Sequence, residues 1–454
     1  MLGSHMSNKF IEIDRTKPIN LAGDRSGWLD QNSLARFVVE VVEQLDTQDI
    51  EKAYRGGGSA PYPPKMMLAL IFYCYAKGIF SSRKIEQASY ELIPVIYITG
   101  GTHPDHDSIN KFRKRFLSQM TAIFVQILEY ACSLGIFKLG DISMDGTKIN
   151  ANASKHKAMS WDYACKLEEQ LKGEIEELMS KAESESGQSS RDIDIPEELQ
   201  RREERLGKIE EIKAEIEKRA QARYDEEKAE YDSNIKNRAT KEKEIGRKLG
   251  GRKPKEPEPG PKGKDQVNFT DEESRIMPVA GGGFEQAYNA QASVDMDTML
   301  IVGNHISQNP NDKQEVEPAL AELDKLPESL GKVEKAALDS GYFSEHNTQK
   351  FAEKEIEPNI PSGRQNHYPS LEERFGAPPL PNPDALTAMK HRLKTDEGRE
   401  FYAKRKSTVE PVFGIIKEVI GFRRFMLRGL QAVTGEWTLV CIAFNLKRLF
   451  ALSV

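Results

Sequence analysis

Residues 284–295 read FEQAYNAQASVD, and residues 299–307 read MLIVGNHIS. In both runs apolar and polar side chains alternate with the period of a β-strand. A short acidic turn separates the runs, and this arrangement predicts a β-hairpin. The hairpin is the centre of a predicted sheet, to which the neighbouring segments are added.

The segments on either side of the hairpin extend the sheet. Upstream, residues 141–149 alternate too briefly for a helix and predict a strand that carries Asp145. Downstream, helical stretches alternate with short strands. Residues 312–326 and 344–355 predict helices, and residues 333–339 and 357–361 predict strands, of which the first ends at Asp339. Strands followed by alternating strand and helix are typical of a mixed α/β layer.

The length of 454 residues predicts two or three domains, because single cores stop growing at about 250–300 residues. Helical spacing predicts an all-helical domain over residues 20–137, after an arm, residues 1–19, that begins with a cloning remnant. The sheet domain would comprise residues 138–160 and 266–454. Between its parts, residues 161–265 predict two long charged helices, folded back as a coiled-coil-like hairpin, and a basic Gly/Pro-rich linker. We interpret this insertion as an exposed, salt-bridged spacer. The fold class is multidomain, α plus α/β.

The composition argues against several classes of protein. Hydrophobic residues make up 38% of the chain and charged residues 30%, and no run of about 18 apolar residues predicts a membrane span. Four dispersed cysteines without a CxxC pair predict neither a zinc site nor a disulfide framework. The net charge of −6 is not that of a typical nucleic-acid-binding domain. The charge of residues 390–448 is opposite to that of the whole chain, because this segment holds thirteen Lys and Arg against six Asp and Glu.

A basic helix is predicted within the N-terminal domain, in THPDHDSINKFRKRF (102–116). Asp107 or Ser108 would cap its N-terminus. Its cations are Lys111, Arg113, Lys114 and Arg115. Such a helix could lie on a phosphate backbone or be an ordinary solvated surface helix, and both interpretations stay open.

Three carboxylates are the candidate site residues. Asp145 and Asp339 each end an apolar strand, where ligand sites gather, although a turn-forming Asp is the alternative. Glu410 is predicted inside a helix beside Pro411, where a proline costs about 3 kcal/mol. Converging carboxylates repel one another unless cations bind between them. Oxygen ligands suit Mg²⁺, and two ions about 3.5–4 Å apart can assist phosphoryl displacement.

Cations surround Glu410 in a helix predicted over about residues 396–420. Tyr402, Arg405, Lys406 and Lys417 lie on this helix, with Lys406 one turn and Lys417 two turns from the glutamate. Both lysines would share its face and could neutralise DNA phosphates. Ordinary surface ion pairing is the alternative.

Four blocks of the sequence resemble, in order, the blocks of bacterial insertion-sequence DDE transposases of the insertion sequence 1182 type, related to the insertion sequence 4 and 5 groups. The blocks are DISMDGTKINANASKHKAMS, FEQAYNAQASVD, ALDSGYFSEHN and YAKRKSTVEPVFGIIKEVIGFRRFMLRGL. The resemblance implies a ribonuclease H-like catalytic fold with Asp145, Asp339 and Glu410 as the first, second and third acids and as the metal ligands. It also implies two Mg²⁺ ions per active site, for which Mn²⁺ can substitute.

The block around Glu410 departs from the related signature, which is Tyr, two residues, Arg, three residues, Glu, six residues, Lys. Tyr402 and Arg405 keep the first spacing, and Glu410 and Lys417 keep the last. The middle spacing is one residue longer, so Lys406 stands at the expected cationic position. The sequence therefore leaves open which of Arg405 and Lys406 contacts phosphate.

The implied reaction is cleavage of transposon ends and joining of the freed 3′-hydroxyl to target DNA by transesterification. The implied partners are double-stranded DNA, as terminal inverted repeats and target, and a second copy of the chain on that DNA, with no membrane and no small-molecule substrate. The implied location is the cytoplasm, at the nucleoid. Two alternatives remain: a metal-dependent nuclease or domesticated recombinase of the same fold, and a non-catalytic DNA-binding coiled-coil protein.

Overall fold

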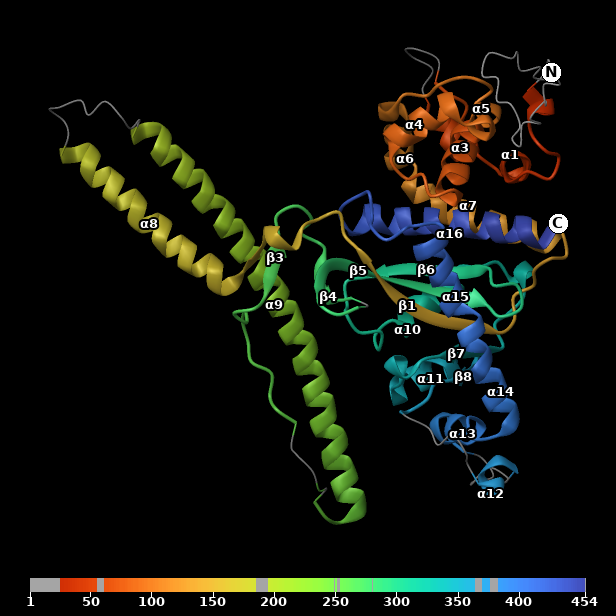
Figure 1. Cartoon of the computed structure of the whole chain (residues 1–454). Helices are drawn as coiled ribbons and strands as arrows, with labels where there is room; N and C mark the ends of the chain where they lie inside the picture. The colour runs from red at the N-terminus through yellow and green to blue at the C-terminus, as the bar shows by residue number, and fades with distance from the viewer. Residues whose placement is uncertain are drawn as a thin grey trace, which may run out of the picture. The chain divides into compact units, whose positions relative to one another are not determined.

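The computed structural model combines helices with a mixed β-sheet (Figure 1). Contacts divide the chain into two compact units, Met1–Lys138 with Leu439–Val454, and Leu139–Thr438. The predicted N-terminal arm lies outside the described residues, as does most of the predicted break between the two long helices. The structure describes residues 25–54, 61–184, 195–248, 250, 254–279, 281–363, 370–375 and 383–453.

The first unit is helical. Its most buried element is α3, in which every residue from Met67 to Ala76 is buried. The last part of α16 (Leu430–Ser453) belongs to the same unit, and the ring of Phe450 lies 5.6 Å from that of Phe37. The helices are α1 (Leu34–Gln44), α2 (Gln48–Lys52), α3 (Pro64–Ala76), α4 (Ser82–Glu91), α5 (Ile93–Ile98), α6 (His106–Arg115) and α7 (Met120–Ser133).

The basic helix α6 differs from its prediction in two ways. Its N-cap is Asp105, whose carboxylate accepts a hydrogen bond from the Ser108 amide at 2.9 Å, so the predicted caps Asp107 and Ser108 are wrong. Arg113 is buried and donates to the Tyr75 hydroxyl at 2.7 Å. This arginine therefore stabilises the helical core and is not part of an exposed basic face. The exposed cations of the helix are Lys111, Lys114 and Arg115.

The second unit contains a mixed sheet. The predicted hairpin is confirmed as β5 (Phe284–Asp295) and β6 (Ile301–Ser307), which pair antiparallel. β5 also pairs antiparallel with β4 (Arg275–Pro278) and with β1 (Ile142–Asn150). On the other side of β1, β7 (Lys335–Leu338) and then β8 (Glu357–Asn359) add in parallel. The order is β4-β5-β1-β7-β8, with β6 paired to β5.

Two predicted helices connect the outer strands. α10 (Val316–Leu323) lies between β6 and β7 in the chain, and α11 (Glu345–Glu353) lies between β7 and β8. The central strand β5 is buried at every residue from Gln286 to Asp295, although its sequence alternates as if one face met solvent. Its polar face is therefore covered by other parts of the protein.

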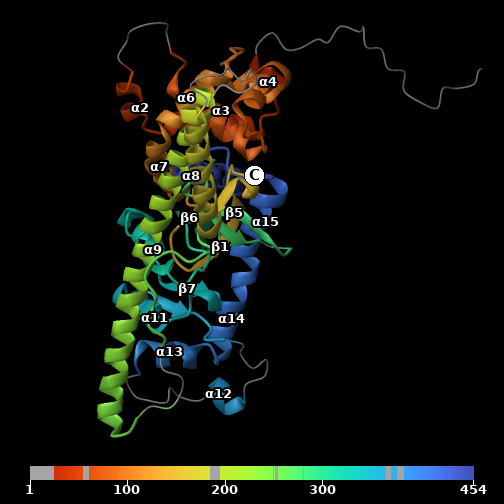
Figure 2. The ribbon, with the colours of Figure 1, turned by 90° about the vertical axis from the view of Figure 1, so that its left-hand side faces the viewer.

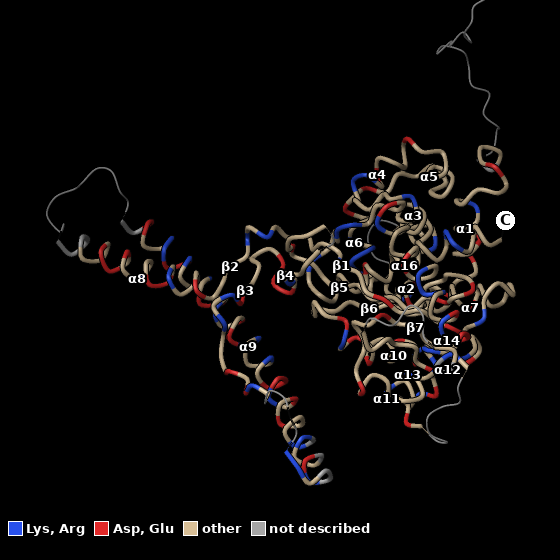
Figure 3. The backbone as a smooth tube through the Cα atoms, turned by 60° about the horizontal axis from the view of Figure 1, so that its bottom comes forward, with Lys and Arg blue, Asp and Glu red and all other residues tan. Residues whose placement is uncertain are grey.

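The insertion between β1 and β5 contains the two long helices that the sequence predicted, α8 (Trp161–Ser184) and α9 (Ile195–Ile245). They lie antiparallel, because Arg202 pairs with Glu174 at 3.0 Å whereas Lys213, further along α9, pairs with Glu168, nearer the start of α8. Opposite charges alternate along both helices (Figure 3). α9 is the longer helix and continues past the base of α8 (Figures 1 and 2).

A small apolar core closes the base of this helical insertion. Strands β2 (Ala158–Ser160) and β3 (Gln266–Asn268) pair antiparallel and bring the two ends of the insertion together. The buried residues of this core are Met159, Ala164, Leu167, Leu171, Ile209, Ile212, Ile216 and Val267. No helix in the described ranges of the chain is both long and apolar enough to cross a membrane.

The C-terminal segment corrects the prediction of one helix over residues 396–420. The structure has α14 (Asp396–Lys404), a 3-10 turn (Arg405–Ser407), α15 (Val409–Gly414) and a π-turn (Ile415–Val419). The break falls at Thr408, whose backbone angles of φ −113° and ψ −82° are not helical. Two helices precede this segment, α12 (Leu371–Phe375) and α13 (Ala385–Arg392).

Candidate functional site

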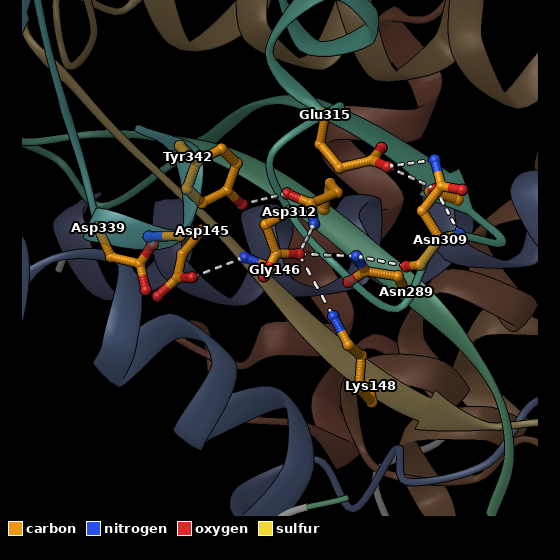
Figure 4. Close-up of polar contacts among 12 residues, drawn as sticks. Asp145, Gly146, Lys148, Asn289, Asn309, Asp312, Glu315, Asp339 and Tyr342 are labelled. Carbon is orange, nitrogen blue, oxygen red and sulfur yellow. Dashed lines mark hydrogen bonds and ion pairs between the residues drawn. The ribbon is translucent and has the colours of Figure 1, made fainter. Parts of the chain in front are cut away.

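Strand register places two of the predicted acids side by side. The parallel pairing of β1 and β7 ends with Met144 opposite Leu338, and the next residues are Asp145 and Asp339. Figure 4 shows the two carboxylates approaching each other where this pairing ends. Asp145 does not terminate its strand, as the sequence suggested, because β1 continues to Asn150. It lies where β1 loses its parallel neighbour, which opens space for a side chain.

The third acid, Glu410, lies in the first turn of α15 and not inside a long helix. Pro411, beside it, therefore occupies a position where the missing amide donor breaks no helical hydrogen bond. The expected cost and bend of a proline in mid-helix do not arise. The break at Thr408 also rotates the residues before it relative to those after it. The prediction that Lys406 shares the face of Glu410 assumed a continuous helix. The break at Thr408 separates the two residues, so the structure does not support this prediction.

Arg405 joins two of the acids. Its Nη1 donates to Asp145 Oδ2 at 3.0 Å, and its Nη2 donates to Glu410 Oε1 at 3.0 Å. Its side chain is 11% exposed. Asp339 also acts on Arg405 electrostatically. One guanidinium thus joins two of the acids by hydrogen bonds, a pattern that suits its planar fork of donors, and the charge of the third acid acts on it.

The other predicted cations lie elsewhere. Lys417 is half-buried and donates from Nζ to the Lys148 carbonyl oxygen at 2.9 Å, and burial lowers the pKa of its ammonium group. Lys406 is exposed. Tyr402 lies on α14 near Arg405, and burial raises the pKa of its hydroxyl. The structure therefore brings Tyr402 and Arg405 to the acids and uses Lys417 to hold α15 and its π-turn against β1.

Asp145 has an unusual electrostatic environment. Burial raises the pKa of its carboxyl to about 6, and the negative charges of Asp339 and Asp312 act in the same direction. The Gly146 amide, which donates to Asp145 Oδ1 at 2.8 Å, and the Arg405 guanidinium oppose this rise. The carboxylate is thus short of positive charge near neutral pH, which is the condition in which an added cation binds favourably.

The raised pKa predicts that Asp145→Asn stabilises the protein. The pKa of the Asp145 carboxyl in the folded protein, about 6, lies above the ordinary value of 3.8. The cost of the buried charge is therefore absent below about pH 4, grows between these two pKa values, and reaches its full size above about pH 6. At pH 7 the variant should gain at most about 3 kcal/mol in the free energy of unfolding. Urea titrations of both proteins at pH 7 and pH 4 measure this gain. An equal difference at the two pH values would contradict the assignment.

A polar network beside the acids was not predicted from the sequence. Asp312 Oδ1 accepts hydrogen bonds from Asn289 and Gln291 at 2.7 Å each and from Lys148 at 3.3 Å (Figure 4). The Tyr342 hydroxyl donates to the Gln291 side chain. These groups cover the polar face of β5. The available signal was the alternation of Asn and Gln along a strand that an α/β fold buries on both faces.

The network continues to a second carboxylate, Glu315, which is buried. Glu315 accepts from Ser307 Oγ at 2.7 Å and from Asn309 Nδ2 at 3.1 Å, and lies 2.9 Å from His305 Nε2. Asp312 and Glu315 both lie in the connection from β6 to α10. Buried polar groups need partners, and these contacts fix that connection beside Asp145.

The donor chemistry of the site suits a divalent cation. In the part of the chain that the structure describes, no group of three or more His, Cys, Asp or Glu side chains is arranged to hold a metal ion. Arg405 instead occupies oxygens of Asp145 and Glu410. These oxygens are of the kind that Mg²⁺ prefers, and they already accept a cation from the protein. The acids therefore fit a divalent ion in chemistry, beside the two oxygens, Asp145 Oδ2 and Glu410 Oε1, that Arg405 holds.

Two family models match parts of the chain. Residues 381–450 match a model described as "Transposase DDE domain", and residues 24–115 match one described as "Transposase domain (DUF772)". The first match includes Arg405 and Glu410, and the second lies in the helical unit. No curated protein and no solved structure matches the chain. The two matches support an insertion-sequence transposase family and a DNA-processing enzyme of the transposase type.

Proposed function

We propose that this chain, with its two transposase matches, is a DDE transposase that cleaves transposon ends and joins the freed 3′-hydroxyl to target DNA. The observation that carries the proposal is the register of β1 and β7, which sets Asp145 beside Asp339. Arg405 then links this pair to Glu410, because it donates hydrogen bonds to both Asp145 and Glu410. Asp339 does cap the 3-10 turn Ser340–Tyr342, because its carboxylate accepts a hydrogen bond from the Gly341 amide at 2.7 Å. Turn formation alone, however, does not explain why three acids from distant parts of the chain lie near one another.

The strand order supports a ribonuclease H-like assignment for the sheet domain. Such a domain has three antiparallel strands, with two further strands parallel to the first on its other side. Here β1, β5 and β6 form the antiparallel part, and β7 and β8 add in parallel beside β1. The insertion of α8 and α9 falls between the first two of these strands. We assign the site to Asp145, Asp339 and Glu410 on this basis.

Two Mg²⁺ ions, or Mn²⁺ in their place, would activate the attacking oxygen and stabilise the leaving oxygen of an in-line displacement. The protein's own residues prepare the site for this. Arg405 holds Asp145 and Glu410 together through one guanidinium, which offsets the repulsion between their charges. The network around Asp312 keeps β1 and the connection after β6 in place beside the acids.

The proposed reaction has two steps and no covalent bond to the protein. In the first, water attacks the phosphorus at the transposon end, the bond to the 3′-oxygen breaks, and the oxygen leaves as a 3′-hydroxyl. In the second, this hydroxyl attacks a target phosphodiester, and the target strand's own 3′-oxygen leaves. The number of phosphodiester bonds is conserved in the second step, so no external energy source is needed.

The test is a joining assay with purified protein, a duplex that carries the element's terminal repeat followed by flanking DNA, and a plasmid target. The label is placed at the 5′ end of the strand whose 3′-hydroxyl is freed, so that it stays with the transferred strand. We expect label to enter the plasmid only when Mg²⁺ or Mn²⁺ is present. Cleavage of the duplex without joining would favour the nuclease alternative. Binding without cleavage in either metal would reject the proposal and favour a non-catalytic DNA-binding protein.

A second prediction separates Arg405 from its neighbour. Arg405→Lys keeps the charge but cannot bridge two carboxylates with a planar fork, so we expect cleavage to fall about tenfold to a hundredfold. Lys406→Gln removes an exposed charge and should change cleavage less. Initial cleavage rates of the two variants make the comparison. A greater loss in Lys406→Gln would assign the phosphate contact to Lys406.

The helical unit and the oligomeric state complete the proposal. The predicted helical domain, residues 20–137, would bind the terminal inverted repeats; residues 24–115 within it match a transposase domain. Exposed cations of α6 are available for phosphate contacts that set the register on DNA. Because two transposon ends must be joined to one target, we propose that two copies of the chain act together on DNA.

A further inference from the structure

A basic pocket lies at the far end of β1 from the acids. It has a volume of about 410 Å³ and is lined by Asn152, Lys155, Lys157, Glu285, Arg424 and Arg428, among others. We propose that this pocket binds the phosphodiester backbone of the DNA whose scissile phosphate lies at Asp145. The identity of that DNA rests on the proposed function, whereas the pocket itself rests on the contacts described next.

The charge of the pocket favours a polyanion. Four cations and one carboxylate, Glu285, line it, which leaves an excess of three positive charges, with the neighbouring histidine counted as neutral. Lys155 pairs with Glu285 at 2.9 Å, so part of the positive charge is already compensated. Lys157 and Arg424 are exposed, and among the described residues no side chain pairs with either. These two cations are therefore available to a phosphate.

The backbone that forms one wall of the pocket is held against β1. The Asn150 amide donates to the Arg423 carbonyl at 3.1 Å, and the Phe425 amide donates back to the Asn150 carbonyl at 2.9 Å. Arg428 Nε donates to the Asn152 carbonyl at 3.0 Å. The segment that carries Arg424 thus continues the sheet beside the end of β1. The cations project from fixed backbone, which reduces the entropy lost on binding.

The opposite wall is also fixed. The Asn268 side chain donates to the Ser154 carbonyl at 2.7 Å, and the Phe269 amide donates to the Lys157 carbonyl at 3.0 Å. These bonds tie the turn after β1 to the end of β3. The pocket is therefore formed before any ligand arrives.

The pocket is linked to the acids through the chain itself. One wall directly follows β1, which carries Asp145, and the other follows α15 and its π-turn, which carry Glu410. From Asp145 to Asn150 the strand extends over about 17 Å, at roughly 3.4 Å per residue. B-DNA rises by about 3.4 Å per base pair, so a duplex along β1 would meet the pocket about five base pairs from the reacting phosphate.

The arrangement of the cations favours a DNA backbone over a single small anion. Lys155 and Lys157 project from one segment, and Arg424 and Arg428 project from another. All four are exposed. A nucleic-acid strand carries a charge at each nucleotide and can meet both segments at once, and such contacts do not depend on sequence.

The test measures binding of the full-length protein to a labelled DNA duplex of arbitrary sequence, by fluorescence anisotropy over a range of NaCl concentrations, with EDTA to prevent cleavage. The variant is Lys157→Gln with Arg424→Gln; Arg428 is kept because it holds the Asn152 carbonyl. Loss of two phosphate contacts should reduce the slope of log K against log salt by about two and weaken binding about tenfold at low salt.

A matched control removes two exposed lysines that precede β7 in the chain, Lys325→Gln with Lys332→Gln; Lys325 pairs with Glu322 at 2.6 Å. It changes the net charge equally and should leave the slope unchanged. An unchanged slope in the pocket variant, or an equal loss in the control, would overturn the proposal. Inorganic phosphate at constant ionic strength should not displace DNA; selective displacement from the parent protein would assign the pocket to a small anion and would also overturn it.

The two proposals fail separately. If the slope changes but the acid variants still cleave DNA, the assigned active site is wrong and the pocket remains a DNA contact. If the acid variants lose cleavage but the slope does not change, the transposase proposal stands and the pocket proposal falls.

Discussion

Asp145→Ala, Asp339→Ala and Glu410→Ala are each expected to reduce metal-dependent DNA cleavage by at least about a thousandfold, or roughly 4 kcal/mol of transition-state stabilisation. In the proposed site, each variant would remove carboxylate oxygens that offset the charge of two bound cations. The effect should not arise from unfolding. Removing Asp145 relieves a buried charge, and the Glu410 side chain is 48% exposed.

The measurement is the initial rate of cleavage of a transposon-end duplex, with DNA binding determined in parallel. Binding should remain within about threefold of the parent, because the proposed phosphate contacts would be made by cations elsewhere on the protein. Glu397→Ala is the matched control, since this glutamate lies on α14 with a side chain 87% exposed. Parent-like cleavage by any one acid variant would remove that residue from the proposed site.

Gly146→Ala is expected to destabilise the protein by about 3 kcal/mol, although alanine normally suits a strand better than glycine. A Cβ atom at this position would lie 2.0 Å from Gln291 Nε2 and 2.8 Å from Asp312 Oδ1. The Gln291 side chain cannot swing away freely, because it is buried and donates to Asp312 while it accepts from Tyr342. The methyl group must therefore break hydrogen bonds inside the network or displace β1.

Urea unfolding at pH 7 measures the change in stability. Gly414→Ala is the control, because nothing lies within 4 Å of a Cβ added there and alanine favours the helix by up to about 1 kcal/mol. Cleavage by Gly146→Ala should also fall, since a shift of β1 moves Asp145. A Gly146→Ala variant as stable as the parent would show that the network beside the acids yields easily.

The strands were predictable because the alternation of apolar and polar residues gives their period and the residues that flank them mark their ends. FEQAYNAQASVD alternates, and the apolar run before Asp339 is too short for a helix. Once β1 and β7 are paired in parallel, their register alone places Asp145 beside Asp339. The proximity of these two acids is therefore a consequence of strand pairing, which local pattern specifies well.

The surroundings of Glu410 were not predictable in the same way. The segment from Asp396 to Ile420 contains Thr408, Val409 and Pro411, which have low helical propensity, and the helix restarts at Val409 with the proline in its first turn. Arg405 turns toward Asp145, 260 residues earlier in the chain, and no local pattern contains that partner. The extra residue between Arg405 and Glu410 is accommodated by the 3-10 turn before α15.

The polar network failed prediction for a different reason. Asp312 is the first residue of the helix predicted over 312–326, directly after a run of Asn and Pro that signals a turn, whereas the structure begins α10 at Val316 and leaves Asp312 in the connection before it. Its role depends on β5 being covered on its polar face, which is a property of the assembled unit. By contrast, the apolar run TLVCIAF directly after Trp437 is a local signal for a core position. Trp437 is indeed buried, and its indole donates to the Gln291 carbonyl at 3.0 Å.

The short ladder of β2 and β3 bears on the order in which the chain folds. Pairing β1 with β5 directly requires closure of a loop of about 130 residues. If α8 and α9 dock first and β2 pairs with β3, only about 22 residues remain between the ends of the two strands. Closure then costs about 1.5 kcal/mol less, because its entropy grows with the logarithm of loop length. The insertion can thus fold locally, ahead of the sheet that it interrupts.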